Sequence, residues 1–221
     1  MTEGERLSAY INSLYPGNTD FLDQIEEEAK LSGVPVIRKE MQSLLKFLLK
    51  SFQPSCILEV GTAVGFSALF MSEYAPEDCQ ITTIEKYEKR IPIAKKNFIR
   101  GGKEDKIKLL EGDAMEILKG LQGTYDFIFM DAAKGQYIHY LPEVLRLLPK
   151  GGLLVSDNVL QDGDIIESRF AVERRNRTIH ARMREYLYTL MHHEELVTSV
   201  LPLGDGATVS IRTGNGPEGG I

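Results

Sequence analysis

Short apolar segments alternate with helical segments between residues 56 and 157, and this alternation constrains the fold more than any other feature. The apolar segments are "CILEV" (56–60), "QITTIE" (80–85), "KIKLLEG" (106–112), "YDFIFMD" (125–131) and "GLLVSD" (152–157). The segments between them, 65–75, 87–101, 113–121 and 136–148, have helical periodicity. Short apolar strands that alternate with helices predict βαβ units and a parallel sheet buried on both faces.

The regions that flank this alternation predict helices before it and a helix with two further strands after it. The first fifty residues predict helices, among them "IRKEMQSLLKFLLKSF" (37–52), and a long polar helix is expected over 164–192. The segment "LVTSVLPLGDGATVSIR" (196–212) predicts two strands joined by a Gly-Asp-Gly turn. We therefore expect an α/β fold whose mostly parallel seven-stranded sheet ends in an antiparallel C-terminal hairpin. One domain should span 1–213, with N-terminal helices in 1–52, a core in 53–213 and a flexible tail in 214–221.

Composition narrows the possible environment and partners. A net charge of −6 argues against a general nucleic-acid binder. No apolar run approaches the roughly 18 residues of a membrane span, and the acidic, polar start "MTEGERLSAY" does not resemble a signal peptide. The two cysteines do not suggest a disulfide framework. A cytoplasmic protein with no membrane partner is expected.

A glycine turn, "EVGTAVGFS" (59–67), follows the first predicted strand. In open α/β sheets, ligands bind beyond the carboxyl ends of the strands. The G-x-x-x-G spacing, with Ala63 where a dinucleotide site has glycine, disfavours NAD and favours a nucleoside without a pyrophosphate. Glu85, 24 residues after Gly61, ends the second strand at a position suited to bind both ribose hydroxyls. Alternatively, Glu85 only caps the next helix.

Oxygen donors also end the fourth and fifth predicted strands, at Asp131 and at Asp157-Asn158. Neighbouring strands would bring these side chains together. Two carboxylates and an amide carbonyl suit a hard cation such as Mg²⁺, Mn²⁺ or Ca²⁺. Helix-capping Asp and Asn residues are the open alternative. No G-x-S-x-G elbow or P-loop is present.

Several motifs together resemble one family. They are "LEVGTAVGFSA", "IEK", "EGDA", "YDFIFMDAAKGQY", "GGLLVSDNVL" and "LGDG". Over about residues 30–212 the chain resembles the cation-dependent O-methyltransferases of the catechol and caffeoyl-CoA type, which have the class I S-adenosylmethionine (SAM) fold. The motifs "DAAK" and "DNVL" carry most of this likeness.

The resemblance implies residue roles. Gly61 and Ser67 would lie beside the methionine part of SAM, and Glu85 would bind the ribose. Asp113 and Ala114 would border the adenine, and Ile37 would contact the cofactor from the N-terminal segment. Asp131, which would also border SAM, would hold a divalent cation, most simply Mg²⁺, with Asp157 and Asn158. Lys134 matches the catalytic lysine. A homodimer is usual in the family.

The same resemblance bears on the acceptor, which should carry vicinal oxygens because the cation would chelate both. The order of segments after residue 170 resembles the bacterial branch that methylates 5-hydroxyuridine at the tRNA wobble position, giving 5-methoxyuridine. An arginine cluster could bind anticodon-stem phosphates; its members are Arg174, Arg175, Arg177, Arg182 and Arg184. It could equally form a solvated helix face or a subunit contact. The alternatives are a small catechol-like or caffeoyl-type acceptor, and a non-catalytic nucleotide- or tRNA-binding module.

Overall fold

The structure, a computed structural model, describes residues 3–168 and 170–214. The expected flexible tail therefore lies almost entirely outside the described residues. Three helices come first: α1 (Glu3–Ser13), α2 (Asp20–Leu31) and α3 (Lys39–Phe52). The alternating region follows as β1 (Cys56–Val60), α4 (Phe66–Tyr74), β2 (Gln80–Glu85), α5 (Ile91–Arg100), β3 (Ile107–Glu111), α6 (Ala114–Gly120), β4 (Phe127–Met130), η1 (Lys134–Gln136), α7 (Tyr137–Leu147) and β5 (Leu153–Asp157). The chain then forms η2 (Gln161–Ile166), η3 (Arg174–Asn176), α8 (Arg177–His192), β6 (Leu196–Leu201) and β7 (Ala207–Arg212).

The strands form one seven-stranded sheet in the order β3-β2-β1-β4-β5-β7-β6. The first five are parallel, and β7 pairs antiparallel with both β5 and β6. The expected Rossmann-like fold with an antiparallel C-terminal hairpin is confirmed. Strand order reverses between β1 and β4, so the ligand site of such a sheet should lie at their carboxyl ends.

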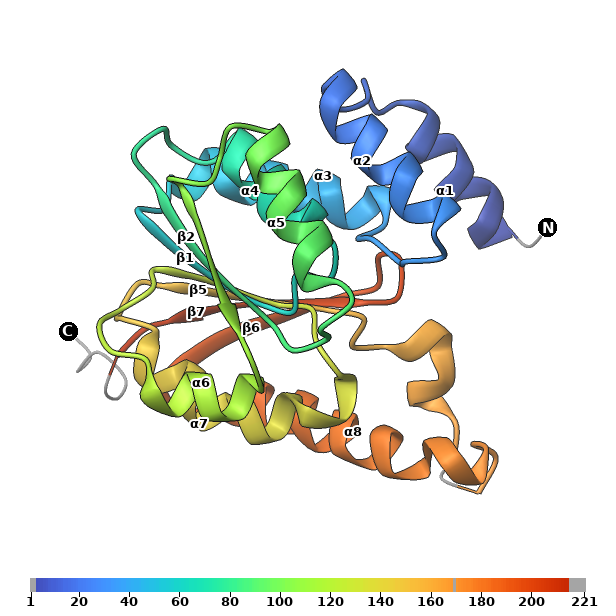
Figure 1. Cartoon of the computed structure of the whole chain (residues 1–221). Coiled ribbons are helices and arrows are strands. Elements are labelled where there is room, and N and C mark those ends of the chain that lie inside the picture. The colour runs from blue at the N-terminus through green and yellow to red at the C-terminus, as the bar shows by residue number, and fades with distance from the viewer. Residues whose placement is uncertain (1–2, 169, 215–221) are drawn as a thin grey trace.

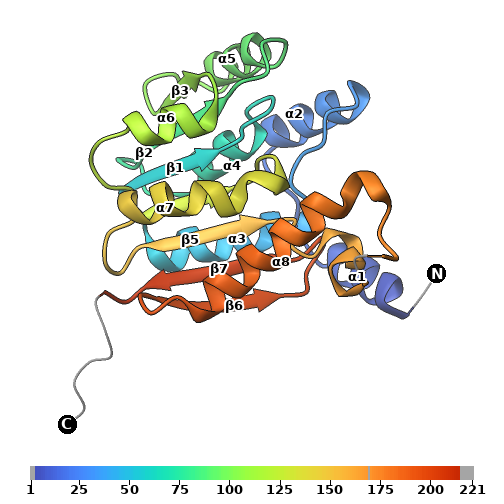
Figure 2. The same ribbon diagram turned by 90° about the horizontal axis from the view of Figure 1, so that it is seen from below.

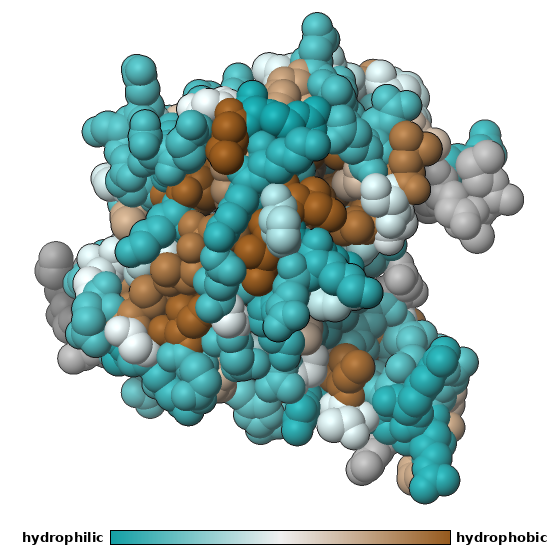
Figure 3. All heavy atoms as spheres, in the orientation of Figure 1, coloured by the Kyte–Doolittle hydropathy of each residue, from teal (hydrophilic) through white to brown (hydrophobic). Residues whose placement is uncertain are grey.

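Helices cover both faces of the sheet. Helices α2 to α5 lie on one face, and α6, α7 and α8 cross the other (Figures 1 and 2). Each face has its own hydrophobic core, one built around Phe70 and Leu45 and the other around Tyr137 and Val144. This burial explains why β4 and the first three residues of β5 are all apolar. Figure 3 shows hydrophobic atoms gathered between the two helix layers, where edge strand β3 runs in Figure 1.

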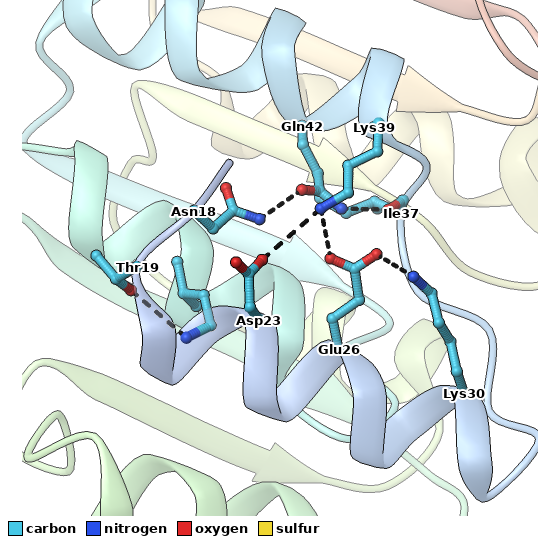
Figure 4. A network of polar contacts seen from close by, with 9 residues as sticks. Asn18, Thr19, Asp23, Glu26, Lys30, Ile37, Lys39 and Gln42 are labelled. Atoms are coloured by element: carbon cyan, nitrogen blue, oxygen red, sulfur yellow. Dashed lines mark hydrogen bonds and ion pairs between the residues drawn. The ribbon is translucent and has the colours of Figure 1, made fainter. Parts of the chain in front are cut away.

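Polar contacts fix the N-terminal helices α2 and α3 against each other (Figure 4). Glu26 is buried between Lys30 and Lys39, at 2.6 and 2.8 Å. Burial alone would raise the pKa of Glu26, but hydrogen bonds from these two lysines lower it. Gln42 Nε2 donates to the carbonyl of Ile37 at 2.9 Å. The segment before α3 is thereby held at the end of the sheet where the site lies.

The predicted helix over 164–192 is wrong in its first part. Gly163 adopts a φ of +95°, and Glu173 has extended backbone before η3, so α8 begins only at Arg177. Arginine side chains bind the carbonyls that a helix ladder would have used. Arg177 donates to the carbonyls of Val172 and Phe170, and Arg184 donates to that of Ile165. Among the described residues, no helix is both long and apolar enough to cross a membrane.

Candidate active site

A cavity of about 770 Å³ opens at the carboxyl ends of the parallel strands, beside the reversal of strand order. All residues predicted to bind the cofactor or the cation, and the predicted lysine, contribute to its wall. They are Ile37, Gly61, Ser67, Glu85, Asp113, Ala114, Asp131, Lys134, Asp157 and Asn158. The structure thus brings together residues that are as much as 121 positions apart, from Ile37 to Asn158 (158 − 37). Whether each performs its predicted role stays a prediction.

The glycine turn packs closely against the end of β4. Gly61 has a φ of +98°, and a Cβ added there would overlap the carbonyl oxygen of Asp131. Gly65, at a φ of +88°, would place a Cβ 2.6 Å from the Phe98 ring. Only glycine meets both demands at no steric cost. The two glycines therefore let the turn pack directly against the end of β4 and against α5.

Glu85 organises this turn. Its Oε2 accepts the N–H of Ala63 at 2.8 Å, and its Oε1 accepts those of Lys86 and Tyr87 at 2.9 and 2.7 Å. Ala63 needs this anchor because it holds an uncommon positive φ of 49°. Glu85 therefore stabilises the loop and also lines the pocket. The alternative that it caps the next helix is wrong, because α5 begins only at Ile91 and has no side-chain cap. Asp113, by contrast, caps α6 through Met115 N at 3.0 Å and also lines the pocket.

Glu85→Gln is expected to weaken SAM binding about tenfold or more. The amide keeps the size of the side chain but removes the charge from its acceptor, and a hydrogen bond to a charged group contributes about 1.5–3 kcal/mol. Calorimetric titration with SAM measures the loss. Glu88→Gln, at an exposed acid outside the pocket, is the control. Equal affinity of Glu85→Gln and the wild type would remove Glu85 from the cofactor site.

Asp131 and Asp157 form an uncompensated acidic pair. Burial raises the pKa of Asp131 to about 7, and the charge of Glu59 adds to this. Burial also raises the pKa of Asp157 to about 7, with a further contribution from the charge of Asp131. The charge of Lys134 lowers both pKa values without reversing the shift. Within the described ranges, no group of three His, Cys, Asp or Glu side chains is arranged to hold a metal; here the third donor would be the Asn158 amide.

These pKa shifts predict that Asp131 and Asp157 destabilise the cation-free protein as the pH rises. Both carboxyls have a folded pKa above the unfolded value of about 3.9, so between about pH 4 and 7 each binds more protons in the folded state. Their contribution to the free energy of unfolding should therefore fall across this window and level off above pH 7. Urea denaturation in EDTA measures it. Asp157→Asn should raise the free energy of unfolding at pH 8 and make it depend less on pH. An unchanged pH dependence would show that the pKa of Asp157 is not raised.

Two tyrosines that were not predicted as site residues hold the ends of the strands beside the pocket. The buried Tyr137 hydroxyl accepts the N–H of Ala132 at 3.2 Å and faces the carbonyls of Met130 and Asp157 at 3.1 and 3.2 Å. It therefore joins the ends of β4 and β5. Tyr186 packs edge-on against it, at 5.5 Å between ring centroids, and its hydroxyl pairs with Ser156 Oγ at 2.7 Å. Arg38 and Asp205 also line the pocket and were likewise not predicted.

The arginine cluster lies outside the pocket wall. Arg182 donates to the carbonyl of Gly135 at 3.1 Å, and Arg177 and Arg184 bind loop carbonyls as described above. Arg174 and Arg175 are exposed, and Arg175 pairs with Glu173 at 2.7 Å. Three of the five arginines thus hold neighbouring loops, and the other two, Arg174 and Arg175, are exposed cations before α8. Of the aromatic residues nearby, Tyr186 is buried whereas Phe170 and Tyr188 are exposed.

The fold and the pocket together define a Rossmann-like methyltransferase, and comparisons with known proteins agree. The O-methyltransferase family model matches residues 13–213. A caffeoyl-CoA O-methyltransferase of Populus kitakamiensis is 33% identical over 227 residues, which cover 95% of this chain and 94% of the relative. A catechol O-methyltransferase of Niastella koreensis is 32% identical over 169 residues, 74% of this chain and 76% of that protein.

A solved structure extends the likeness. The SAH-bound methyltransferase PaMTH1 of Podospora anserina matches with a TM-score of 0.86 at 28% identity, over 97% of both chains. The chain belongs to the O-methyltransferase family and is a SAM-dependent O-methyltransferase of the type that includes the caffeoyl-CoA and catechol enzymes.

Proposed function

We propose that this enzyme methylates one hydroxyl of an acceptor with two vicinal oxygens, and that a divalent cation held by Asp131, Asp157 and Asn158 is required. One observation carries the proposal: two carboxyls with raised pKa values share a pocket wall with an amide and a lysine. Such a pair is costly unless a cation neutralises it. The donor set of carboxylate and amide oxygens, with no His or Cys, fits Mg²⁺ or Mn²⁺.

The pocket residues would divide the work between cofactor and acceptor. Gly61, Ser67, Glu85, Asp113 and Ala114 would hold SAM, with Ile37 on the N-terminal side. SAM supplies a methyl group on a positive sulfonium, so the reaction needs mainly an aligned acceptor oxygen. A bound cation would lower the pKa of the chelated hydroxyl and fix its orientation.

Lys134 would serve the reacting oxygen directly. It begins η1, three residues after Asp131, and its charge acts on both Asp131 and Asp157. From there its charged Nζ can stabilise the oxyanion, whereas taking the hydroxyl proton requires the neutral amine. SAM would supply the methyl group, whose S–CH₃ bond would break as the new O–CH₃ bond forms on this oxygen.

The test compares acceptors that differ by one hydroxyl. A 3,4-dihydroxy aromatic acid and its 4-hydroxy analogue are incubated with methyl-labelled SAM and Mg²⁺, with and without excess EDTA. Transfer should occur only to the dihydroxy compound and only with available cation, and added Mg²⁺ should restore it after chelation. Full activity in EDTA, or equal transfer to the 4-hydroxy analogue, would contradict the proposal.

A second candidate acceptor is 5-hydroxyuridine in tRNA, whose O5 and O4 are also vicinal. The observation in its favour is the pair of exposed cations Arg174 and Arg175, close in the chain to the exposed Phe170. Cations contribute affinity through phosphates, and an aromatic ring can stack on an unpaired base. At a net charge of −6, RNA binding would have to rest on a local cationic patch of this kind.

Replacing both exposed arginines with glutamine should separate the two acceptors. Each lost phosphate contact should lower the salt slope of tRNA binding by about 0.7–0.9 units, so the double variant should lose up to about two. Methylation of the small dihydroxy acid should not change. Lys108→Gln with Lys150→Gln, two exposed cations elsewhere, is the matched control. Filter binding at several salt concentrations measures the slopes, and identical slopes would exclude these arginines from an RNA interface.

A further inference from the structure

The turn between β6 and β7 carries a buried acid that no role above uses. Asp205 lies in the Gly-Asp-Gly turn, yet it is only 8% exposed, and it lines the same pocket as Asp157 and Asn158. A turn residue of this kind would ordinarily point its charge to water. The contacts of Asp205 explain its position.

The backbone of this turn holds the segment that follows β5. The carbonyl of Asp205 accepts the N–H of Leu160 at 2.8 Å, and the carbonyl of Gly206 accepts that of Val159 at 3.0 Å. Immediately before them, Asn158 adopts a positive φ of 58°. Asn tolerates this conformation better than most residues, although it still needs support from its surroundings. The turn therefore supports the backbone on which Asn158 is presented.

The side chain of Asp205 acts on the Asn158 amide itself. Asn158 Nδ2 lies 3.4 Å from Asp205 Oδ2. An ionised carboxylate can only accept hydrogen bonds, so the amide must turn its nitrogen toward Asp205. This leaves Oδ1 of Asn158 as the atom available to the pocket. The orientation matters because only the oxygen of an amide binds a hard cation.

A cation from the N-terminal segment secures the other oxygen of Asp205. Arg38 Nη2 lies 2.6 Å from Asp205 Oδ1. Arg38 follows Ile37, whose carbonyl is held by Gln42, so the ion pair links the N-terminal wall of the pocket to the hairpin turn. The Arg38 side chain is half exposed, so its role is to hold Asp205 in place rather than to add much stability.

We propose that Asp205 is a positioning residue for the cation: it fixes the Asn158 amide with its oxygen toward the pocket, and Arg38 holds it there. This inference rests on the proposed function, because it presupposes that Asn158 is a cation ligand. It assigns to the Gly-Asp-Gly turn a purpose beyond reversing the chain. Outer-shell partners of this kind typically change metal affinity 10- to 100-fold when removed.

The test measures cation affinity, not activity. Mn²⁺ is titrated into the full-length SAM-loaded protein, and free Mn²⁺ is read by electron paramagnetic resonance. Asp205→Ala should weaken Mn²⁺ binding at least tenfold and leave SAM affinity within twofold, which also shows that the variant is folded. Asp205→Asn, whose amide oxygen can still accept from Asn158, should recover most of the affinity.

A matched control variant distinguishes a specific loss of Mn²⁺ affinity from a general destabilisation of the fold. Asp126 accepts the N–H groups of Ser55 and Cys56, both at 2.9 Å, at the start of β1, so Asp126→Ala removes an anchor far along the chain from the turn. Its Mn²⁺ affinity should match the wild type. Wild-type affinity in Asp205→Ala would overturn the positioning role, as would equal losses in the Ala and Asn variants. Absence of saturable Mn²⁺ binding to the wild type would instead overturn the cation site itself, and the inference with it.

Discussion

Asp157→Ala is expected to lower the kcat of methyl transfer at least a thousandfold. The substitution removes one of two carboxylates from the cation site, and the polarisation that a bound cation supplies is worth several kcal/mol, with each 1.36 kcal/mol equal to a factor of ten. SAM binding should largely survive, because the cation would serve the acceptor oxygen. Single-turnover assays with methyl-labelled SAM, beside calorimetric SAM titration, measure both.

A stability measurement tests whether the loss of activity comes from unfolding of the variant. Because burial and the charge of Asp131 raise the pKa of Asp157, its removal should not destabilise the cation-free protein at pH 8. A large loss of activity with preserved stability would therefore locate the defect in the site. Wild-type turnover in Asp157→Ala would show that the acceptor oxygen is activated without this carboxylate.

Lys134→Met should have the second largest effect, a loss of about 10²–10⁴-fold in kcat. Methionine keeps much of the length and apolar stem but neither takes a proton nor stabilises an oxyanion. Cation affinity should move in the opposite direction from that of Asp157→Ala. Lys134 carries a positive charge that acts on both carboxyls, so its loss should leave Mn²⁺ binding unchanged or tighter.

The comparison of the two variants separates their roles. Asp157→Ala should lose both the cation and the reaction, whereas Lys134→Met should lose only the reaction. Lys134→Arg retains the charge without an easily released proton, so any turnover it keeps reports oxyanion stabilisation. If Lys134→Met bound Mn²⁺ much more weakly than the wild type, the lysine would be a support of the cation site and not a catalytic residue.

The sheet and its site were predictable for the same physical reason. Strands buried on both faces, such as β4 (FIFM) and β5 (LLVSD), begin as apolar runs, and carboxylates mark their carboxyl ends. Asp131 and Asp157 stand at those ends, on neighbouring parallel strands. Parallel strands bring their carboxyl ends to one edge, so position in the chain was enough to place both residues in one pocket.

The region before α8 was not predictable from periodicity. Its polar sequence is compatible with a helix, but Gly163 and the extended Glu173 interrupt it. What stabilises the irregular backbone is a set of tertiary bonds from arginine side chains to loop carbonyls, such as that from Arg184 to Ile165. No local pattern reports a partner that lies 19 residues away.

The supporting residues of the site were missed because their roles exist only in three dimensions. Tyr137 reads as one apolar position of a helix, yet its hydroxyl joins the ends of β4 and β5. Asp205 lies in a Gly-Asp-Gly pattern, which predicts a turn between two strands. The turn alone accounts for this pattern, so the sequence does not indicate that Asp205 also contacts the site. Its contacts with Asn158 and Arg38 bring together positions from the start, middle and end of the chain.

The proposed mechanism requires that the acceptor oxygens bind a cation in this pocket, and this contact can be measured directly. Mn²⁺ is bound to the SAM-loaded protein, and a catechol acceptor carrying ¹⁷O in both hydroxyls is added while the electron paramagnetic resonance spectrum is recorded. We expect the Mn²⁺ lines to broaden relative to those with the unlabelled catechol, and Asp157→Ala to abolish the bound signal. Bound Mn²⁺ whose lines are identical with labelled and unlabelled acceptor, under conditions in which methyl transfer proceeds, would contradict the proposed mechanism.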